Sequence, residues 1–274
     1  MRPYIMKVLV AFVCLLGSVQ GALAVDHLRL TDIRSLGMGG SGVVQSALFN
    51  PALVALSEDK LIRMGYFNRY NLRELGTVSG SFYFPNDLLS AGMNISSFGY
   101  DAYRESLFRL FAGKRLGERW ALGVGIQYAL LQTELFEEAP SRLSADMGLT
   151  FSPVDNLLTG LLIMNVPSVK LGGKDIDVKD FSFYYIQVGF QWEFINNLFI
   201  SGHLGNDGER ALSGGLGMEY VPFERFSLRA GVAGEPFLPS FGAGYGFRHF
   251  GVDVSVVYHP VLGASTGFGL SYTL

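Results

Sequence analysis

Apolar side chains alternate with small or polar ones along most of this chain, from Lys60 to Leu274. Between positions 120 and 130, for example, the even-numbered residues are Trp, Leu, Val, Ile, Tyr and Leu, and the odd-numbered ones are Ala, Gly, Gly, Gln and Ala. Successive side chains of a β-strand point to opposite faces, so this alternation predicts strands with one apolar face. We therefore expect an all-β fold over residues 60–274.

The alternation divides into about fourteen segments of roughly ten residues, the spacing typical of a transmembrane β-barrel. The segments are expected to begin near Lys60, Leu75, Leu88, Tyr103, Glu118, Arg142, Leu157, Phe181, Leu198, Ala211, Phe226, Ser240, Phe250 and Ser265. A soluble β-sandwich or barrel also alternates, but it buries its bulky apolar residues and exposes many charges. Here only 16% of residues are charged, and Gly, Ser, Gln and Asp dominate the less apolar face. The sequence therefore favours an antiparallel transmembrane β-barrel of about 14 strands, with lipid against the apolar face.

The connections between the segments are of two kinds. Tight turns are expected at Pro85–Asp87, Lys114–Glu118, Ser152–Asp155, Ile195–Asn197 and Pro222–Arg225. The intervening connections tend to be longer, and the longest runs from Pro167 to Asp180. Membrane barrels have short periplasmic turns and longer outer loops, so the tight turns are assigned to the periplasmic end.

The first 24 residues are expected to be a secretory leader. Arg2 and Lys7 supply its positive end, residues 8–17 form an apolar core, and an Ala-Leu-Ala triplet precedes Val25. This arrangement fits a cleaved signal peptide, so the mature chain is expected to begin at Val25. An uncleaved anchor is the alternative, but the apolar core is well short of the roughly 20 residues that a spanning helix needs.

The single cysteine, Cys14, lies within the expected leader. Val13 precedes it where a lipidation motif needs a small residue, so lipid attachment is disfavoured. Cleavage leaves no thiol, and no disulfide is expected.

Residues 25–59 lack the alternation and contain a glycine-rich stretch, Ser35-Leu36-Gly37-Met38-Gly39-Gly40-Ser41-Gly42. A short helix is expected over Ser46–Leu56, interrupted at Pro51, because proline ends or kinks the helix that precedes it. A region this small cannot bury a core of its own. We therefore expect residues 25–59 to pack inside the barrel that residues 60–274 form.

Ser35–Gly40 followed by Ala47-Leu48-Phe49-Asn50-Pro51-Ala52 resembles the start of mature FadL-like outer-membrane proteins. That family includes channels for long-chain fatty acids and aromatic hydrocarbons, and the PorV/PorQ branch linked to type IX secretion in Bacteroidetes. The resemblance implies a fourteen-stranded barrel with an N-terminal hatch. The residues it assigns to the hatch are Gly37, Gly39, Gly40, Gly42, Asn50, Pro51 and Ala52. The short loops depart from the fatty-acid channels and are closer in layout to the PorV/PorQ-type barrels.

The stretch Gly37–Gly42 also matches the G-x-G-x-x-G pattern of dinucleotide-binding loops. Such a loop needs a strand before it and a helix that opens at it, within βαβ units. Here the preceding residues are charged and irregular, and alternating strands follow. Close packing inside the barrel is the better explanation of these glycines.

Strand parity places several ionisable residues on the lumen side of the wall. They are Arg63, Arg69, Glu105, Arg109, Asp146, His203, Glu219, Arg229, Asp253 and His259. One interpretation is a polar path that selects what crosses. The other, which we favour, is a network of ion pairs and hydrogen bonds that holds the hatch, because charges away from water need partners.

The sequence offers no pattern for catalysis, a metal or a cofactor. The histidines are scattered, at positions 27, 203, 249 and 259, with no pair at metal-ligand spacing. The G-x-S-x-G pattern of serine hydrolases is matched by Gly263-Ala264-Ser265-Thr266-Gly267, but this match lies among the alternating segments, so no nucleophile elbow is expected. The acidic group at positions 175, 177 and 180 is interleaved with lysines and lacks the glycine of a calcium loop, so a solvated loop is expected. The net charge of −3 and the absence of a basic run argue against nucleic-acid binding.

Two functions from different classes follow from this reading. The first is passage of small hydrophobic compounds across the bacterial outer membrane, suggested by lumen positions assigned to Phe67, Tyr83, Phe111, Leu161 and Ile163. The second is a PorV/PorQ-like scaffold or carrier in a secretion system, with no transport of its own. A purely structural barrel is the remaining option. In each case the partners are outer-membrane lipid and either small hydrophobic ligands or secretion proteins.

Overall fold

The computed structural model describes residues 30–134, 138–173, 184–206, 212–234 and 236–274. Three sequence-based predictions fall outside these residues. They are the leader over residues 1–24, the start of the mature chain at Val25 and the acidic loop at positions 175, 177 and 180.

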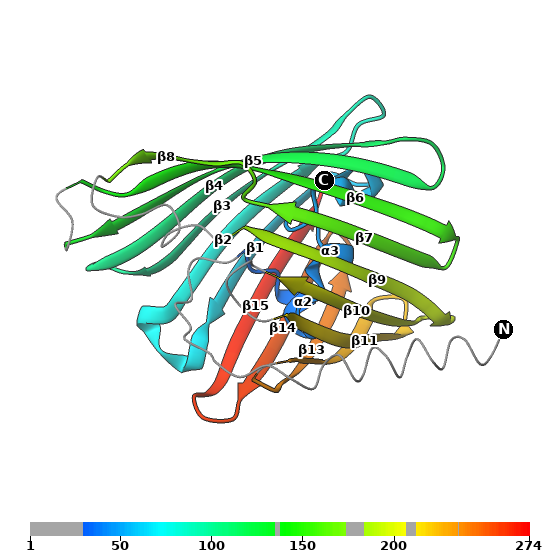
Figure 1. Ribbon diagram of the computed structural model, residues 1–274. Coiled ribbons are helices and arrows are strands. Elements are labelled where there is room, and N and C mark those ends of the chain that lie inside the picture. The colour runs from blue at the N-terminus through cyan, green and yellow to red at the C-terminus, as the bar shows by residue number, and fades with distance from the viewer. Residues whose placement is uncertain (1–29, 135–137, 174–183, 207–211, 235) are drawn as a thin grey trace.

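Antiparallel strands surround a central space, with the short helices near the N-terminus inside it (Figure 1). The strands are β1 (Leu61–Asn68), β2 (Gly76–Phe84), β3 (Ser90–Tyr100), β4 (Tyr103–Arg115), β5 (Trp120–Thr133), β6 (Ser141–Val154), β7 (Leu157–Met164), β8 (Ser168–Gly172), β9 (Tyr185–Ile195), β10 (Leu198–Asn206), β11 (Ser213–Phe223), β12 (Phe226–Ala233), β13 (Leu238–Phe247), β14 (Phe250–His259) and β15 (Gly263–Thr273). Each pairs with its neighbours in sequence except around β8, and pairing of β1 with β15 closes the ring. In the described part of the chain, fourteen strands form the barrel and β8 is additional. The predicted all-β barrel and its strand number are confirmed.

β8 lies within the stretch that the sequence assigned to the longest loop, Pro167–Asp180, so that assignment is wrong over Ser168–Gly172. This strand pairs with the start of β6, as in Arg142 opposite Lys170. Val169 and Leu171 alternate with polar neighbours, but five residues give a weak periodic signal. A break of three residues, Asn165–Pro167, separates β7 from β8.

The bulky apolar residues lie on the outer face of the wall and the small and polar ones on its inner face. On β5, Val124 and Ile126 are exposed, whereas Ala121 and Gln127 are buried. On β7 the parity was misassigned: Leu161 and Ile163 face outward, opposite Leu149 and Met147 of β6. Leu162 and Met164 face the interior instead. The error arises because both faces of β7 are apolar, so alternation cannot fix its direction.

The five turns predicted to be tight all lie at one end of the barrel. The two chain segments that flank the wall also meet there, since the Leu274 N–H donates to the Lys60 carbonyl at 2.9 Å. We call this end the turn end and the opposite one the loop end. The Asp101–Ala102 connection at the loop end is as short as these turns, so the expected difference in length is wrong there. Assignment of the turn end to the periplasm stays a prediction.

Residues 30–59, called the inner segment below, contain three short helices: α2 (Ile33–Leu36), α3 (Gly42–Gln45) and the 3₁₀-helix η1 (Pro51–Leu56). Two more 3₁₀ turns, η2 (Arg69–Asn71) and η3 (Arg73–Leu75), connect β1 to β2. The expected helix over Ser46–Leu56 is wrong in its first half, because Pro51 begins η1 rather than interrupting a helix. The N–H of a residue at the first helical position makes no hydrogen bond within the helix, so proline, which lacks this group, is tolerated there. Within the described residues, no helix has the length and apolar character needed to cross a membrane.

Candidate functional site

The inner segment runs across the barrel interior and contacts the wall on opposite sides. α2 packs against β13, β14, β15 and β1, whereas α3 packs against β7 and β9. η1 packs against β3, β4, β5 and β6. Side-chain caps fix the starts of two of these helices: Asp32 accepts from the Arg34 N–H at 3.1 Å, and Asn50 accepts from the Ala52 N–H at 3.1 Å. The segment therefore has a defined shape that the wall encloses.

The four glycines assigned to the hatch motif lie in this segment, and three of them, Gly37, Gly39 and Gly42, have little space around their Cα atoms. Gly39 and Gly40 have positive φ angles of 68° and 81°, which residues with a Cβ rarely adopt. A Cβ on Gly39 would lie 2.6 Å from the Val232 carbonyl oxygen, and one on Gly42 would lie 2.5 Å from the Phe49 ring. A Cβ on Gly37 would approach Gly242 of the wall to 3.1 Å. Backbone shape and close approach thus both require glycine here.

Asn50, Pro51 and Ala52 are all buried against the wall. The Asn50 amide donates to the Val43 carbonyl at 2.9 Å, while its oxygen caps η1. This one side chain therefore links α3 to η1.

The wall itself contributes glycines to this contact, and no sequence pattern singles them out. A Cβ on Gly148 of β6 would collide with the Asn50 side chain, and one on Gly113 of β4 would lie 2.7 Å from the Pro51 carbonyl oxygen. On the opposite side, Cβ atoms on Gly217 and Gly231 would collide with Met38 and Gly39. Inward-facing glycines thus form the surface on which the inner segment lies.

A charged cluster joins α2 to the wall at β11, β12 and β14. Arg34 donates to Glu219 at 2.5 Å, and the Arg229 guanidinium donates to Glu219 at 2.7 Å and to Asp253 at 2.5 Å. Burial lowers the pKa of Arg34, but attraction to and hydrogen bonding with Glu219 outweigh this, and the net pKa is raised. Arg34 thus stays charged and paired at neutral pH. Three predicted lumen residues, Glu219, Arg229 and Asp253, come together here.

A second cluster lies across the barrel, around Arg109 of β4. Its side chain is fully buried and donates through Nε to Asp146 at 2.9 Å. The other guanidinium nitrogens donate to the carbonyls of Leu48 and Phe49 in the inner segment. Asp146 also accepts from the backbone N–H of Asn165 at 2.9 Å. Arg109 and Asp146 therefore connect the inner segment to the break between β7 and β8.

The break is held by a polar network around Asn165, a residue with φ of 61°. Its side-chain oxygen accepts from Arg142 at 2.8 Å, from Ser144 at 3.0 Å and from the Gln127 amide. The network could not be foreseen from sequence, because Asn165 lies outside the alternating segments.

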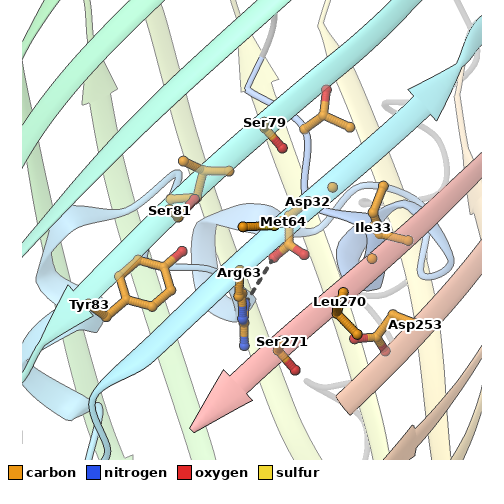
Figure 2. A pocket seen from close by; sticks show the side chains of 14 residues that line it. Asp32, Ile33, Arg63, Met64, Ser79, Ser81, Tyr83, Asp253, Leu270 and Ser271 are labelled. Atoms are coloured by element: carbon orange, nitrogen blue, oxygen red, sulfur yellow. Dashed lines mark ion pairs between the residues drawn. The ribbon is translucent and has the colours of Figure 1, made fainter. Parts of the chain in front are cut away.

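A small polar cavity of about 30 Å³ lies between α2 and the wall strands β1, β2, β14 and β15. Figure 2 shows Arg63 and Asp32 facing each other across it, with Nη1 and Oδ2 3.8 Å apart. Tyr83, Ser81 and Ser271 also line it. A volume of this size admits about one or two water molecules.

Four predicted lumen residues remain, namely His203, Glu105, Arg69 and His259. His203 Nδ1 lies 3.1 Å from the Ser41 hydroxyl, in contact with the inner segment. Glu105 is buried on β4 and accepts from the Tyr103 hydroxyl at 2.5 Å. Arg69 is buried near the loop end, with its guanidinium 5.0 Å from the Phe98 ring centroid. His259 lies at the loop end of β14, beside the Tyr70 ring. Among the described residues, no group of three or more acidic, histidine or cysteine residues is arranged to hold a metal.

Solved structures with this arrangement include hydrocarbon channels. The toluene transporter TodX of Pseudomonas putida is 12% identical, with a TM-score of 0.65 over 92% of this chain and 99% of that one. A FadL homologue of Pseudomonas aeruginosa is 13% identical, with a TM-score of 0.59 over 90% of this chain and 98% of that one. The chain shares their fold. Its fold is an antiparallel transmembrane β-barrel like theirs, and the closeness to PorV/PorQ-type barrels stays a prediction from the sequence layout.

A TodX variant described as a monoaromatic hydrocarbon channel aligns with 89% of this chain and 98% of its own length, at 12% identity and a TM-score of 0.60. No protein-family model matches the sequence, and no curated protein matches it.

Proposed function

We propose that this barrel lies in the bacterial outer membrane and passes small hydrophobic compounds, with residues 25–59 as its hatch. It acts by diffusion and carries out no chemical reaction. Support comes from the shared fold with TodX, a toluene transporter, and with a FadL homologue. The glycine-rich stretch and Asn50–Ala52 then serve to seat the hatch in the lumen.

The observation that carries the proposal is an apolar strip on the inner face of the wall. Leu107, Ala129, Leu162 and Met164 face inward from β4, β5 and β7. Leu30, Val43, Val44 and Leu48 of the inner segment cover them. A hydrophobic solute that displaces the inner segment replaces one apolar contact with another, whereas a polar solute loses its hydration there. The interior therefore favours apolar cargo along this side.

The break between β7 and β8 lies at the end of this strip, since Met164 is the last residue of β7. The ladder between β7 and β9 ends at Met164 opposite Tyr185, and in the described part of the chain β8 pairs with β6 only. The proposed route runs along the strip and leaves either through the wall at Asn165–Pro167 or at the turn end.

The test is uptake of a fluorescent aromatic hydrocarbon by vesicles with lipopolysaccharide in the outer leaflet and cyclodextrin trapped inside as a sink. Vesicles that contain the barrel should fill faster than empty ones. The variant Met164→Gln makes the strip polar at nearly constant volume and should slow uptake several-fold. Met147→Gln is the matched control, because Met147 faces outward from β6.

Equal uptake by empty and barrel-containing vesicles would contradict the proposal. Equal slowing by both methionine variants would show that the strip is not the route.

The alternative is a PorV/PorQ-like scaffold or carrier for a secretion system. The observation in its favour is the shortness of two loop-end connections, Asp101–Ala102 and Pro260–Leu262, which leave no large outer groove beside them. Purification of the tagged barrel from native membranes decides the point. Stable recovery of secretion proteins supports the scaffold, whereas recovery of the barrel alone counts against it.

A further inference from the structure

The connection between β14 and β15 is apolar up to its tip. Val261 is 84% exposed and Leu262 52% exposed, and they follow the outward row of Val254, Val256 and Tyr258 on β14. The sequence from Val254 to Leu274 contains no Asp, Glu, Lys or Arg. From Val254 onward the hairpin thus contains no such charged residue, and its connection joins strands β14 and β15 directly (Figure 1, red strand β15 and the connection at the lower edge).

The backbone of this tip is also adapted to a medium without water. The His259 Nδ1 atom accepts hydrogen bonds from the N–H groups of Val261, at 3.1 Å, and Leu262, at 3.0 Å. Pro260 has no N–H to satisfy. Hydrocarbon offers no hydrogen-bond partners, so a backbone donor immersed in it needs an internal acceptor. All three residues of the connection meet this requirement for their donors.

The tip between β3 and β4, at the same end of the barrel, has the opposite character. Asp101 is fully exposed and pairs with Arg104 at 3.2 Å, the latter also being largely exposed. Charged side chains in that position need water. Two connections at one end of the barrel are therefore built for different surroundings.

We propose that the β14–β15 tip inserts into the hydrocarbon of the adjacent lipid leaflet, whereas the β3–β4 tip lies in water. Lipid is the occupant that fits, because the tip extends a surface that already faces lipid and offers no charge to a protein partner. The loop end of the barrel then lies deeper in the leaflet on the β14–β15 side than on the β3–β4 side. Solutes dissolved in the leaflet reach the loop end on the β14–β15 side. The inference needs only a barrel that spans a membrane, so it stands or fails independently of transport.

The experiment uses single-cysteine variants of the full chain carrying Cys14→Ser, labelled with an environment-sensitive fluorophore and placed in lipid nanodiscs, where both faces are accessible. Val261→Cys reports on the tip. Ala102→Cys is the aqueous reference on the β3–β4 connection, and Val256→Cys is the lipid reference on the wall. Leu262→Cys repeats the measurement should the first variant fold poorly.

The label at position 261 should be quenched by nitroxide-bearing lipids as strongly as that at 256. Iodide should quench it several-fold less than the label at 102. Iodide quenching equal to that at 102 would overturn the proposal, because the tip would then lie in water. Protection from both quenchers would also overturn it, since a second copy or another protein would then cover the tip.

Discussion

At the scale of single residues, Asn50 joins two parts of the inner segment while fully buried. Replacement by Ala removes the η1 cap, at a cost of about 0.5–2 kcal/mol, and leaves the Val43 carbonyl without its donor, at a further cost of about 1–3 kcal/mol. We expect Asn50→Ala to lower the midpoint of thermal unfolding in detergent, followed by circular dichroism. Asn86→Ala is the control, since Asn86 makes a similar local bond to the Leu88 N–H in an exposed turn. An equal fall in the unfolding midpoint of both variants would contradict the expectation that the buried bonds of Asn50 stabilise the fold more than the exposed bond of Asn86.

The wall glycines give a second prediction at this scale. Gly148→Ala places a methyl group against Asn50, and overpacking of this kind costs about 1–3 kcal/mol. Gly80→Ala is the matched control, because a Cβ there meets nothing within 4 Å. We expect only the first variant to increase protease cleavage within residues 30–59, measured by mass spectrometry of limited digests. Equal cleavage in the two variants would show that the wall glycine does not seat the inner segment.

Residues 37–52 can be singled out from the sequence because they are contiguous and break the alternation. Their partners on the wall cannot. Gly148 and Gly246 both lie at inward positions of wall strands. A Cβ on Gly148 would collide with the Asn50 side chain, whereas one on Gly246 would approach only Arg225, at 3.9 Å. The difference depends on which wall positions face the inner segment, and that is a property of the closed barrel.

At the scale of elements, Arg109 connects β4 to the inner segment and, through Asp146, to the break after β7. Removal of one partner of a buried ion pair costs about 3–5 kcal/mol, because the other charge is left unpaired. We expect Arg109→Met to destabilise the barrel strongly. The measurement is the temperature above which the heated protein no longer migrates as the compact folded form on an electrophoresis gel. Arg109→Met with Asp146→Leu should recover part of the loss, since an apolar pair leaves no buried charge. A double variant no better than the single one would mean that the hydrogen bonds to Leu48 and Phe49 dominate.

The elements also show where the alternation of apolar and polar residues fails to predict the structure. Most wall strands have faces that differ in chemistry, so alternation fixes both their existence and their direction. β7 is apolar on both faces, and its inward residues were assigned one position out of register. β8 has too few residues for its alternation to be recognised. Pro51 starts a helix rather than interrupting one, because proline breaks a helix from an interior position but not from the first position, which it occupies in η1.

At the scale of the whole molecule, the barrel is predictable because lipid and lumen impose different chemistry on the two faces of nearly every strand. The signal is repeated around the ring, so an error in one strand leaves the closure unchanged. The position of the inner segment has no such repetition. Ion pairs and glycines that are far apart in sequence fix it, as Arg34 and Glu219 illustrate.

The last prediction concerns how firmly the inner segment closes the lumen. Arg34 links α2 to the wall through Glu219, and a hydrogen bond between charged groups contributes about 1.5 kcal/mol or more. Loss of about 1.4 kcal/mol changes an equilibrium tenfold, so Arg34→Ala should raise the open fraction by roughly that factor. Single-channel recording in planar bilayers should then show more frequent current steps.

Arg104→Ala is the control for this experiment, because the Arg104–Asp101 pair is exposed and makes no contact with α2. Exposed pairs contribute about 0–1 kcal/mol, so this variant should conduct like the original chain. Increased current in Arg104→Ala would point to loosening of the barrel in general. Unchanged current in a correctly folded Arg34→Ala variant would mean that the wall glycines and the Arg109 cluster hold the segment without help from α2.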